Sequence, residues 1–266
     1  MPLPILPTAR SRSDADLLRL FCRTEMLLSD SLAQPIALQS GSALANPQLP
    51  HIAAANRIMD AAIPLGSSAE QTIAEVHAHF AAIGMGCLEW WLNPSQPTGP
   101  LPAALLAAGY AARALQVLAL SSPARPPDRL DIKISVFSAR AALAHAAALA
   151  GEMTASLPHP AEQAEAFLQR LDDPHYELLL AMQSGVPVGM IGLLAGGDLG
   201  RIDPLFIHPG YRDSGLERML IERALELSAR SRFADILVGP PAQPAFFLAA
   251  GFRPAGCLTI YKLPER

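Results

Sequence analysis

Two stretches far apart in the chain have almost the same sequence, and this repeat limits what the chain can fold into. Residues 102–110 read PAALLAAGY and residues 244–252 read PAFFLAAGF, so six of the nine positions are identical. Each stretch follows an apolar run that ends near a proline, CLEWWLNP or ADILVGPP, and leads into another apolar run. Strand, short helix, glycine stop and strand therefore occur twice, which predicts two copies of one fold. Chance similarity between alanine-rich segments is the alternative.

A proline-rich segment separates the two copies. SSPARPPDR, at 121–129, holds three prolines and two serines and has no periodic apolar pattern. The length of 266 residues suits two domains of modest size. We therefore expect one domain at 1–125 and a second at 126–266.

The order of elements defines the fold class. Ser184-Gly185 lies between two apolar runs, YELLLAMQ and VPVGMIGLLAGG, and predicts a two-residue hairpin. GRIDPLFIHP and ADILVGP predict further strands, and LERMLIERALELSA predicts a helix. The other predictions are helices at 13–28, with Ser13 as its cap, 67–82, 138–152 and 160–171, and strands at 130–137 and within 51–62. Hairpins and crossovers together predict an α/β or α+β class, with a mixed, mostly antiparallel sheet flanked by helices in each half.

Composition excludes several classes of function. The net charge is −4 without a long basic run, which argues against nucleic acid as a partner. The best membrane candidate, 101–120, contains Pro, Gly and Arg and is mostly alanine, so we expect no membrane partner. Three isolated cysteines predict reduced thiols and a cytoplasmic location, and no residue spacing predicts a metal site.

One segment, HPGYRDSGLERML at 208–220, has the composition of an anion-binding site. A strand is expected to end near Pro209 and a helix to begin near Ser214. The start of a helix exposes unpaired amides and a positive dipole end, which suit a phosphate. Gly215 lets a ligand approach the backbone, and Arg212 can add a charged contact.

At this segment the chain resembles the GNAT superfamily of acyl-CoA-dependent N-acyltransferases. Arg212 to Glu217 align with the [QR]-x-x-G-x-[GA] loop of that family, and FFLAAGFRPAG resembles its late glycine–phenylalanine stretch. The resemblance covers 130–266 and implies acetyl-CoA, or another acyl-CoA, as co-substrate. The N-terminal half lacks such a loop and resembles the degenerate half of tandem members. The residues implied for coenzyme binding are Leu205, Phe206, Ile207, Arg212, Asp213, Ser214, Gly215, Leu216 and Glu217.

Three positions depart from the family pattern. Glu217 replaces a Gly or Ala, and with Ser214 it forms the S-x-x-E pattern of a capping box, in which the carboxylate would close the start of the helix. Phe247 stands where the family has a tyrosine acid, and it cannot protonate a thiolate. Arg201 stands where a glutamate base is often found. Asp203, on the same face of the strand, is then the candidate general base, and a solvent-exposed or capping carboxylate is the alternative.

The function implied by the resemblance is acyl-CoA-dependent N-acyl transfer, directly to a small-molecule or peptide amine. The alternative is an inactive GNAT-like module that binds a metabolite or a protein, with its phosphate loop closed by Glu217. The sequence does not name the amine. It also leaves the oligomeric state open, a homodimer included.

Overall fold

The computed structural model describes residues 12–121, 134–212 and 214–264. Apart from Ser121, the expected linker at 121–129 lies outside the described residues, and so does Asp213. The division into 1–125 and 126–266 stays a prediction.

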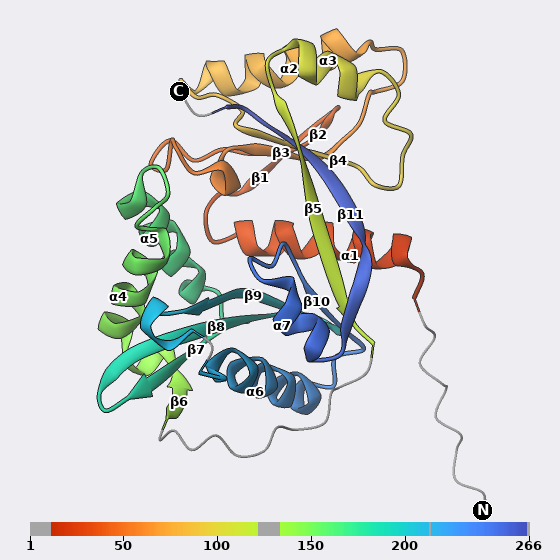
Figure 1. Ribbon diagram of the computed structural model, residues 1–266. Helices are drawn as coiled ribbons and strands as arrows, with labels where there is room; N and C mark the ends of the chain where they lie inside the picture. The colour runs from red at the N-terminus through yellow and green to blue at the C-terminus, as the bar shows by residue number, and fades with distance from the viewer. Residues whose placement is uncertain (1–11, 122–133, 213, 265–266) are drawn as a thin grey trace, which may run out of the picture.

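The described part of the N-terminal half contains three helices and five strands, which are labelled in Figure 1. They are α1 (Asp14–Ser29), β1 (Pro35–Leu38), β2 (Gly41–Leu44), β3 (Arg57–Ala61), α2 (Ala69–Ala82), β4 (Glu89–Leu92), α3 (Leu101–Ala107) and β5 (Ala111–Leu120). Ser13 caps α1 and Ser68 caps α2, each in a capping box with an acceptor three residues later. The predicted helices at 13–28 and 67–82, and the strand within 51–62, are confirmed.

The C-terminal half contains four helices and six strands among the described residues. They are β6 (Ser135–Ser138), α4 (Leu143–Thr154), α5 (Pro160–Gln169), β7 (Tyr176–Gln183), β8 (Val186–Gly196), β9 (Leu199–Ile207), α6 (Leu216–Ser231), β10 (Asp235–Val238), α7 (Pro244–Ala249) and β11 (Phe252–Lys262). Short 3-10 turns lie at η1 (Ala53–Ala55), η2 (Ala139–Ala141), η3 (Arg170–Asp172) and η4 (Pro209–Tyr211). The hairpin at Ser184-Gly185 is confirmed, with both residues at positive φ.

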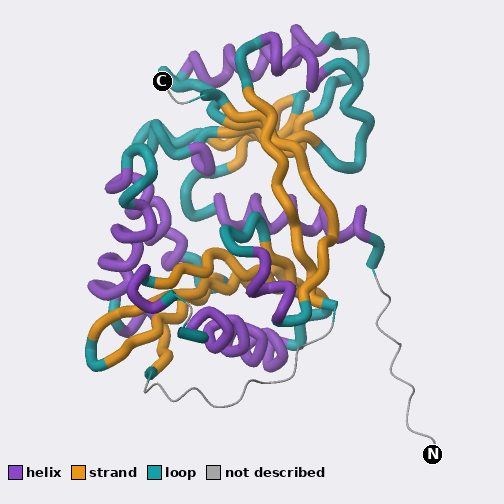
Figure 2. Tube along the Cα trace, viewed as in Figure 1, coloured by secondary structure: helices purple, strands orange, loops and turns teal. Residues whose placement is uncertain are grey.

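All eleven described strands form one continuous sheet in the order β1-β2-β3-β4-β11-β5-β10-β9-β8-β7-β6. Two pairs, β3–β4 and β9–β10, are parallel and the others are antiparallel. The mixed α/β class with a mostly antiparallel sheet and flanking helices is therefore confirmed. In Figure 2 the strands run without interruption from one half of the molecule to the other.

The two halves exchange their last strands. β5 follows β4 in the chain but lies between β10 and β11, and β11 follows β10 but lies between β4 and β5. The two strands pair with each other from Phe252 opposite Leu120 to Lys262 opposite Ala111. Figure 1 shows both as long ribbons that cross from one half to the other. Each half therefore completes its sheet with a strand from the other half.

The sequence repeat corresponds to a repeat in structure. PAALLAAGY contains α3 and leads into β5, whereas PAFFLAAGF contains α7 and leads into β11. The glycines that end the two helices, Gly109 and Gly251, have φ of 92° and 93°, which a side chain would disfavour.

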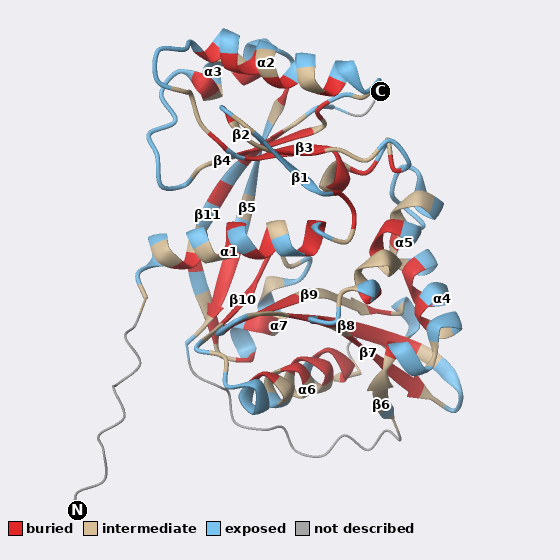
Figure 3. Cartoon of the chain, turned by 180° about the vertical axis from the view of Figure 1, so that it is seen from behind, coloured by how far each residue is buried: buried red, intermediate tan, exposed pale blue. Residues whose placement is uncertain are grey.

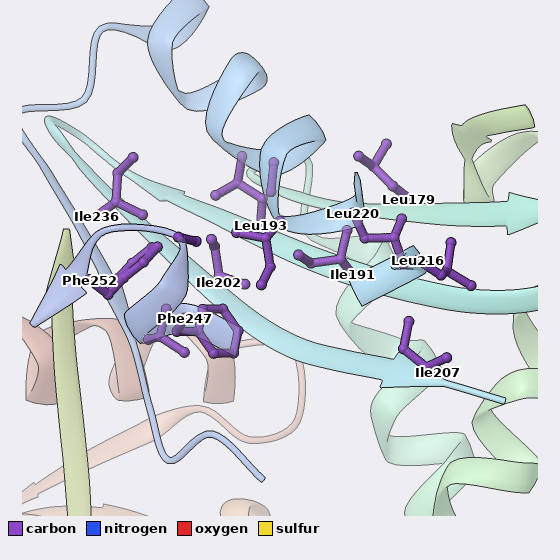
Figure 4. Packing of buried hydrophobic residues seen from close by; sticks show 14 of the residues in the cluster. Leu179, Ile191, Leu193, Ile202, Ile207, Leu216, Leu220, Ile236, Phe247 and Phe252 are labelled. Carbon is purple, nitrogen blue, oxygen red and sulfur yellow. The ribbon is translucent and has the colours of Figure 1, made fainter. Parts of the chain in front are cut away.

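Helix α1 crosses the middle of the molecule and packs on β11, β8, β9 and β5. Figure 3 shows buried residues along the face of α1 that is turned to the sheet. Its side chains join one apolar cluster with Trp91 and Leu237, which come from different halves. A separate cluster fills the space under α6 and α7 (Figure 4). None of the described helices has the length and apolar character that a membrane span needs.

Candidate functional site

A bulge in β9 marks the point where the sheet opens. The register between β8 and β9 shifts here, so Asp203 and Pro204 together stand opposite Gly192. A Cβ atom on Gly192 would lie 2.2 Å from the Tyr176 hydroxyl and 2.3 Å from the carbonyl oxygen of Asp203. That hydroxyl donates a hydrogen bond to the same carbonyl oxygen at 2.9 Å. The bulge therefore requires glycine on the neighbouring strand.

Strands β9 and β10 separate at this bulge. Their parallel pairing ends with Val238 opposite Ile202. β10 stops there, whereas β9 continues beside β8 to Ile207. A cavity of about 310 Å³ occupies the opening. Its lining comes from Met153, from β9 at 202–207, from Arg212 and Glu217, and from the segment 238–247.

The open edge of β9 presents main-chain groups to this cavity. The amide of His208 donates to the carbonyl of Val188 in β8 at 3.0 Å. Main-chain groups of successive residues in a strand alternate between its two sides. Phe206 therefore faces β8, and Leu205 and Ile207 face the cavity. An extended ligand along this edge can form the hydrogen bonds that a neighbouring strand would otherwise make.

Helix α6 begins beside the cavity, with Gly215 as its N-cap at φ 83°. Ser214 is not the N-cap that the expected capping box requires, because the helix begins one residue later. Its hydroxyl donates to the carbonyl of Tyr211 at 2.6 Å and accepts from the amide of Leu216 at 3.4 Å. Glu217 is buried at 3% exposure in the first turn and lines the cavity, and Arg212 lines it from the exposed loop.

The carboxylate of Asp203 lies between two arginines. Arg201 Nη2 donates to its Oδ2 at 3.1 Å, and Arg170 Nη1 lies 3.6 Å from the same oxygen. The side chain keeps 27% of its surface exposed, and the residue lines the cavity. Asp203 therefore combines access to a ligand with a fixed position.

A buried ion network connects this carboxylate to the N-terminal half. Glu25 of α1 accepts from Arg201 of β9 at 2.6 Å and from Arg57 of β3 at 2.9 Å. Arg57 also pairs with Glu89 at 3.3 Å. Burial alone would raise the pKa of Glu25, but the charges of Arg201 and Arg57 lower it to about 2. Glu25 thus links β3 and β9 through one shared anion.

A second cavity, of about 260 Å³, meets the first at the bulge. Asp203, Pro204 and Met153 line both cavities. The second cavity is lined by residues of α4 and α5 of the C-terminal half and by Leu32, Ile52 and Ala54 of the N-terminal half. The bulge therefore separates two spaces, one between the parted strands and one between the halves of the molecule.

Comparison with known proteins gives a family match for most of the C-terminal half, which carries the bulge and the first cavity. Residues 145–265 match the family model described as the acetyltransferase (GNAT) family. This part of the chain is a GNAT domain. No curated protein matches the chain in sequence.

The chain resembles solved structures over most of its length. It is 14% identical to a GCN5-related N-acetyltransferase from Kribbella flavida, with a TM-score of 0.67 over 93% of this chain and 96% of the other. A protein of unknown function from Staphylococcus epidermidis is 13% identical, with a TM-score of 0.61 over 88% and 95%. A tandem GNAT protein from the clavulanic acid biosynthesis pathway is 16% identical, with a TM-score of 0.50 over 74% and 69%. At these identities the likeness concerns the fold.

Phe247 of the GNAT domain lines the first cavity as part of the core. It is 3% exposed and makes an edge-to-face contact with Phe252, the ring centroids being 5.5 Å apart. Figure 4 shows the ring beside Ile202. The described lining of this cavity contains no tyrosine, cysteine or histidine, so it offers no side chain of these types as an acid.

One group of side chains has the spacing of metal ligands. His51, His159 and Glu162 have ligand atoms within 4.8 Å of one another. His51 Nδ1 lies 3.2 Å from the carboxylate of Glu162, and the two imidazole rings are in contact, with centroids 3.7 Å apart and planes tilted by 31°. Both histidines are exposed, and the group lies outside the linings of both cavities at the bulge. The bond between His51 and Glu162 and the contact of the rings account for this arrangement.

The structure brings together most residues that the sequence singled out. Asp203, Leu205, Phe206, Ile207, Arg212 and Glu217 all line the first cavity, while Asp213 lies outside the described residues. Sequence reasoning missed Glu25, Gly192 and Arg170. A signal existed for Glu25, because it lies among buried positions of an amphipathic helix and a carboxylate there needs a partner.

Proposed function

We propose that the chain is an acyl-CoA-dependent N-acetyltransferase that transfers the acyl group directly to a small-molecule or peptide amine. The observation that carries this proposal is the cavity between β9 and β10, which opens at the bulge of a GNAT domain. A separated pair of parallel strands offers main-chain hydrogen bonds along an extended arm, and a helix start lies beside it.

In this proposal the pantetheine arm of acetyl-CoA lies along β9 and pairs with the main chain of Leu205 and Ile207. Its diphosphate binds the amides at 213–217, with Arg212 as a charged contact. The volume of about 310 Å³ suits an arm of this kind, since small-molecule cavities measure roughly 300–1,000 Å³. The residues present therefore fit the co-substrate.

The acceptor amine enters from the second cavity, on the other side of Asp203 and Pro204. Its nitrogen attacks the thioester carbonyl carbon, the new C–N bond forms and the C–S bond breaks. Asp203, or a water beside it, takes the proton from nitrogen. The thiolate leaves unprotonated or takes a proton from water, because thiols ionise at a pKa of roughly 8.5 and are reasonable leaving groups. A main-chain amide at the bulge stabilises the oxyanion.

A second candidate is an inactive module, and two observations favour it. Glu217 places a carboxylate in the lining of the cavity, and Phe247 supplies no acid. Two like charges about 4 Å apart at an effective dielectric near 20 repel by roughly 4 kcal/mol. Such a penalty would suppress binding of a diphosphate.

A titration with acetyl-CoA separates the two candidates. For a transferase, thermal unfolding should show a gain of about 2.7 kcal/mol at a hundredfold excess over the dissociation constant. Glu217→Gln removes one negative charge from the cavity and should tighten binding, by up to about a thousandfold if the full repulsion of roughly 4 kcal/mol is relieved. Glu226→Gln is the matched control, since Glu226 lies on the same helix with a side chain 58% exposed. Absence of a shift in the wild type that appears in Glu217→Gln would favour the inactive module.

The three cysteines, Cys22, Cys87 and Cys257, are free in the structure, and the first two are buried. Burial raises the pKa of both buried thiols to about 12. Free, protonated thiols support our proposal of a cytoplasmic location.

A further inference from the structure

The second cavity has a mixed lining. Its walls are mainly apolar, with Leu32 and Ile52 from the N-terminal half and Phe167 from α5. Two charged residues also line it, Arg170 and Asp203. At about 260 Å³ the space is smaller than the roughly 300–1,000 Å³ of sites for drug-sized ligands. It therefore suits a small molecule with an apolar body.

Arg170 lies at the end of α5, where the chain turns into η3. Its guanidinium lies over the ring of Phe167, 5.7 Å from the centroid, and its side chain is 19% exposed. The Nε atom is buried without a hydrogen-bond partner among the described residues. Burial would lower the pKa of Arg170, but the charge of Asp203 keeps it above its ordinary value. Arg170 therefore presents a permanent cation to the cavity.

The charges around the bulge balance only while Asp203 is ionised. The carboxylates of Glu25, Glu89 and Asp203 face the guanidiniums of three arginines, Arg57, Arg170 and Arg201, in a chain of ion pairs. In the proposed reaction Asp203 accepts a proton from the amine. One negative charge then disappears beside Arg170 and Arg201. A carboxylate on the acceptor, bound before the reaction, would leave Arg170 with an anionic partner after Asp203 is neutralised.

We propose that the acceptor is a small apolar amino acid, whose amine faces Asp203 and whose carboxylate binds Arg170. The pairing of a guanidinium with a carboxylate is among the strongest polar contacts in proteins and fixes orientation. The side chain of the acceptor lies among the apolar residues of both halves, so the N-terminal half takes part in selecting it. This inference rests on the proposed function. It adds the acceptor class and makes Arg170 a specificity-determining residue.

The chemical step is balanced without any further reactant. The amine nitrogen bonds to the acetyl carbon, and the electron pair of the C–S bond leaves with sulfur. The nitrogen proton passes to Asp203 and from there to solvent. The products are an N-acetyl amino acid and CoA.

Paired acceptors provide the test, with release of the CoA thiol as the readout. Phenylalanine is compared with 2-phenylethylamine, and leucine with 3-methylbutylamine, each pair differing only in the carboxylate. We expect kcat/KM to be ten to a hundred times higher for the amino acids, the range for hydrogen bonds to a charged group. Arg170→Gln should remove most of this preference by raising KM for the amino acids. Any loss that arises from its contact with Asp203 falls on both members of a pair, so the ratio within each pair is the readout.

Arg140→Gln is the matched control. Arg140 donates to the main chain of Asp173 and Tyr176 near the same turn but does not line either cavity. It should lower both members of a pair equally, if at all. An equal loss for both members in Arg170→Gln would mean that Arg170 has only a structural role and would overturn the inference.

Binding of acetyl-CoA is measured separately by calorimetry. If acetyl-CoA binds but the simple amines react as well as the amino acids, or neither class reacts, the acceptor class is wrong and the coenzyme site stands. If acetyl-CoA does not bind to the wild type or to Glu217→Gln, the proposed function itself fails and the acceptor inference falls with it.

Discussion

The two halves of the molecule use equivalent elements differently. In the C-terminal half, β9 and β10 separate at Ile202 and a cavity opens between them. In the N-terminal half, β3 and β4 are the equivalent parallel pair. Their register also shifts, between Ile58 and Ala61, but the strands pair again beyond the shift, where Ala61 stands opposite Leu92. Trp90 of β4 is completely buried there. The N-terminal copy therefore has a buried side chain at its parallel pair of strands, where the C-terminal copy has a cavity.

The helices that follow β3 and β9 also begin differently in the two halves. α2 begins with a capping box, in which Ser68 accepts from the amide of Gln71 and the side chain of Gln71 accepts from the amide of Ser68. α6 has Gly215 as its N-cap, and the hydroxyl of Ser214 accepts from the amide of Leu216 at 3.4 Å. A reciprocal capping box uses amides that would otherwise be free to hold a phosphate. The start of α2 is therefore occupied by its own side chains.

The largest effect is expected at the connection between the halves. Glu25→Gln leaves Arg57 and Arg201 without their shared anion, and breaking a buried ion pair costs about 3–5 kcal/mol. Urea unfolding at pH 7 measures this loss. Arg23→Gln, at an exposed position of the same helix, is the control and should change stability by less than about 0.5 kcal/mol.

The pH dependence of the ion pairs of Glu25 sharpens this prediction. The pKa of Glu25 falls from an ordinary 4.5 to about 2 in the folded protein. Its contribution is therefore complete above pH 4.5 and is lost as the pH falls toward 2. The difference in stability between the wild type and Glu25→Gln should shrink over that interval. A difference that stays constant from pH 5 to pH 2.5 would show that ionisation of Glu25 does not account for this pH-dependent stability.

The next largest effect concerns the bulge. Gly192→Ala places a methyl group against the Tyr176 hydroxyl and the Asp203 carbonyl. We expect a loss of about 1–3 kcal/mol in stability, as for other overpacked sites, together with weaker binding of acetyl-CoA in calorimetry. Gly151→Ala, where the added methyl group meets open space within α4, should be neutral or slightly stabilising.

The smallest effect tests the two helix starts against each other. Ser68→Ala should cost about 1 kcal/mol through loss of the cap on α2 and leave acetyl-CoA affinity unchanged. Ser214→Ala should cost less, because Ser214 is not the N-cap of α6. Thermal unfolding of both variants gives the comparison. Equal losses would mean that Ser214 also caps its helix, and the contrast between the two copies would disappear.

Local patterns predicted most elements and the repeat, because caps, hairpin turns and glycine stops depend on neighbouring residues. The exchange of β5 and β11 could not be predicted in this way. The two strands follow nearly identical segments, so either copy offers a suitable partner, and the choice is made by contacts far apart in sequence. The network around Glu25 was missed for the same reason, since its arginines come from β3 and β9.

The candidate site was predicted unevenly. The proposed coenzyme side followed from a motif of consecutive residues near Gly215. The proposed acceptor side is the second cavity, lined by Leu32, Ile52 and Arg170 among others, which no spacing connects. The capping box at Ser214 failed because the pattern alone does not determine at which of two neighbouring residues a helix begins.

A crystal structure with acetyl-CoA tests the central claim most directly, namely that only the C-terminal copy keeps an open site. We predict density for the pantetheine arm between β9 and β10, main-chain hydrogen bonds at Leu205 and Ile207, and the diphosphate at the start of α6. Density beside β3 and β4 instead, or a ligand-free cavity with the Glu217 carboxylate occupying the diphosphate position at saturating acetyl-CoA, would contradict it.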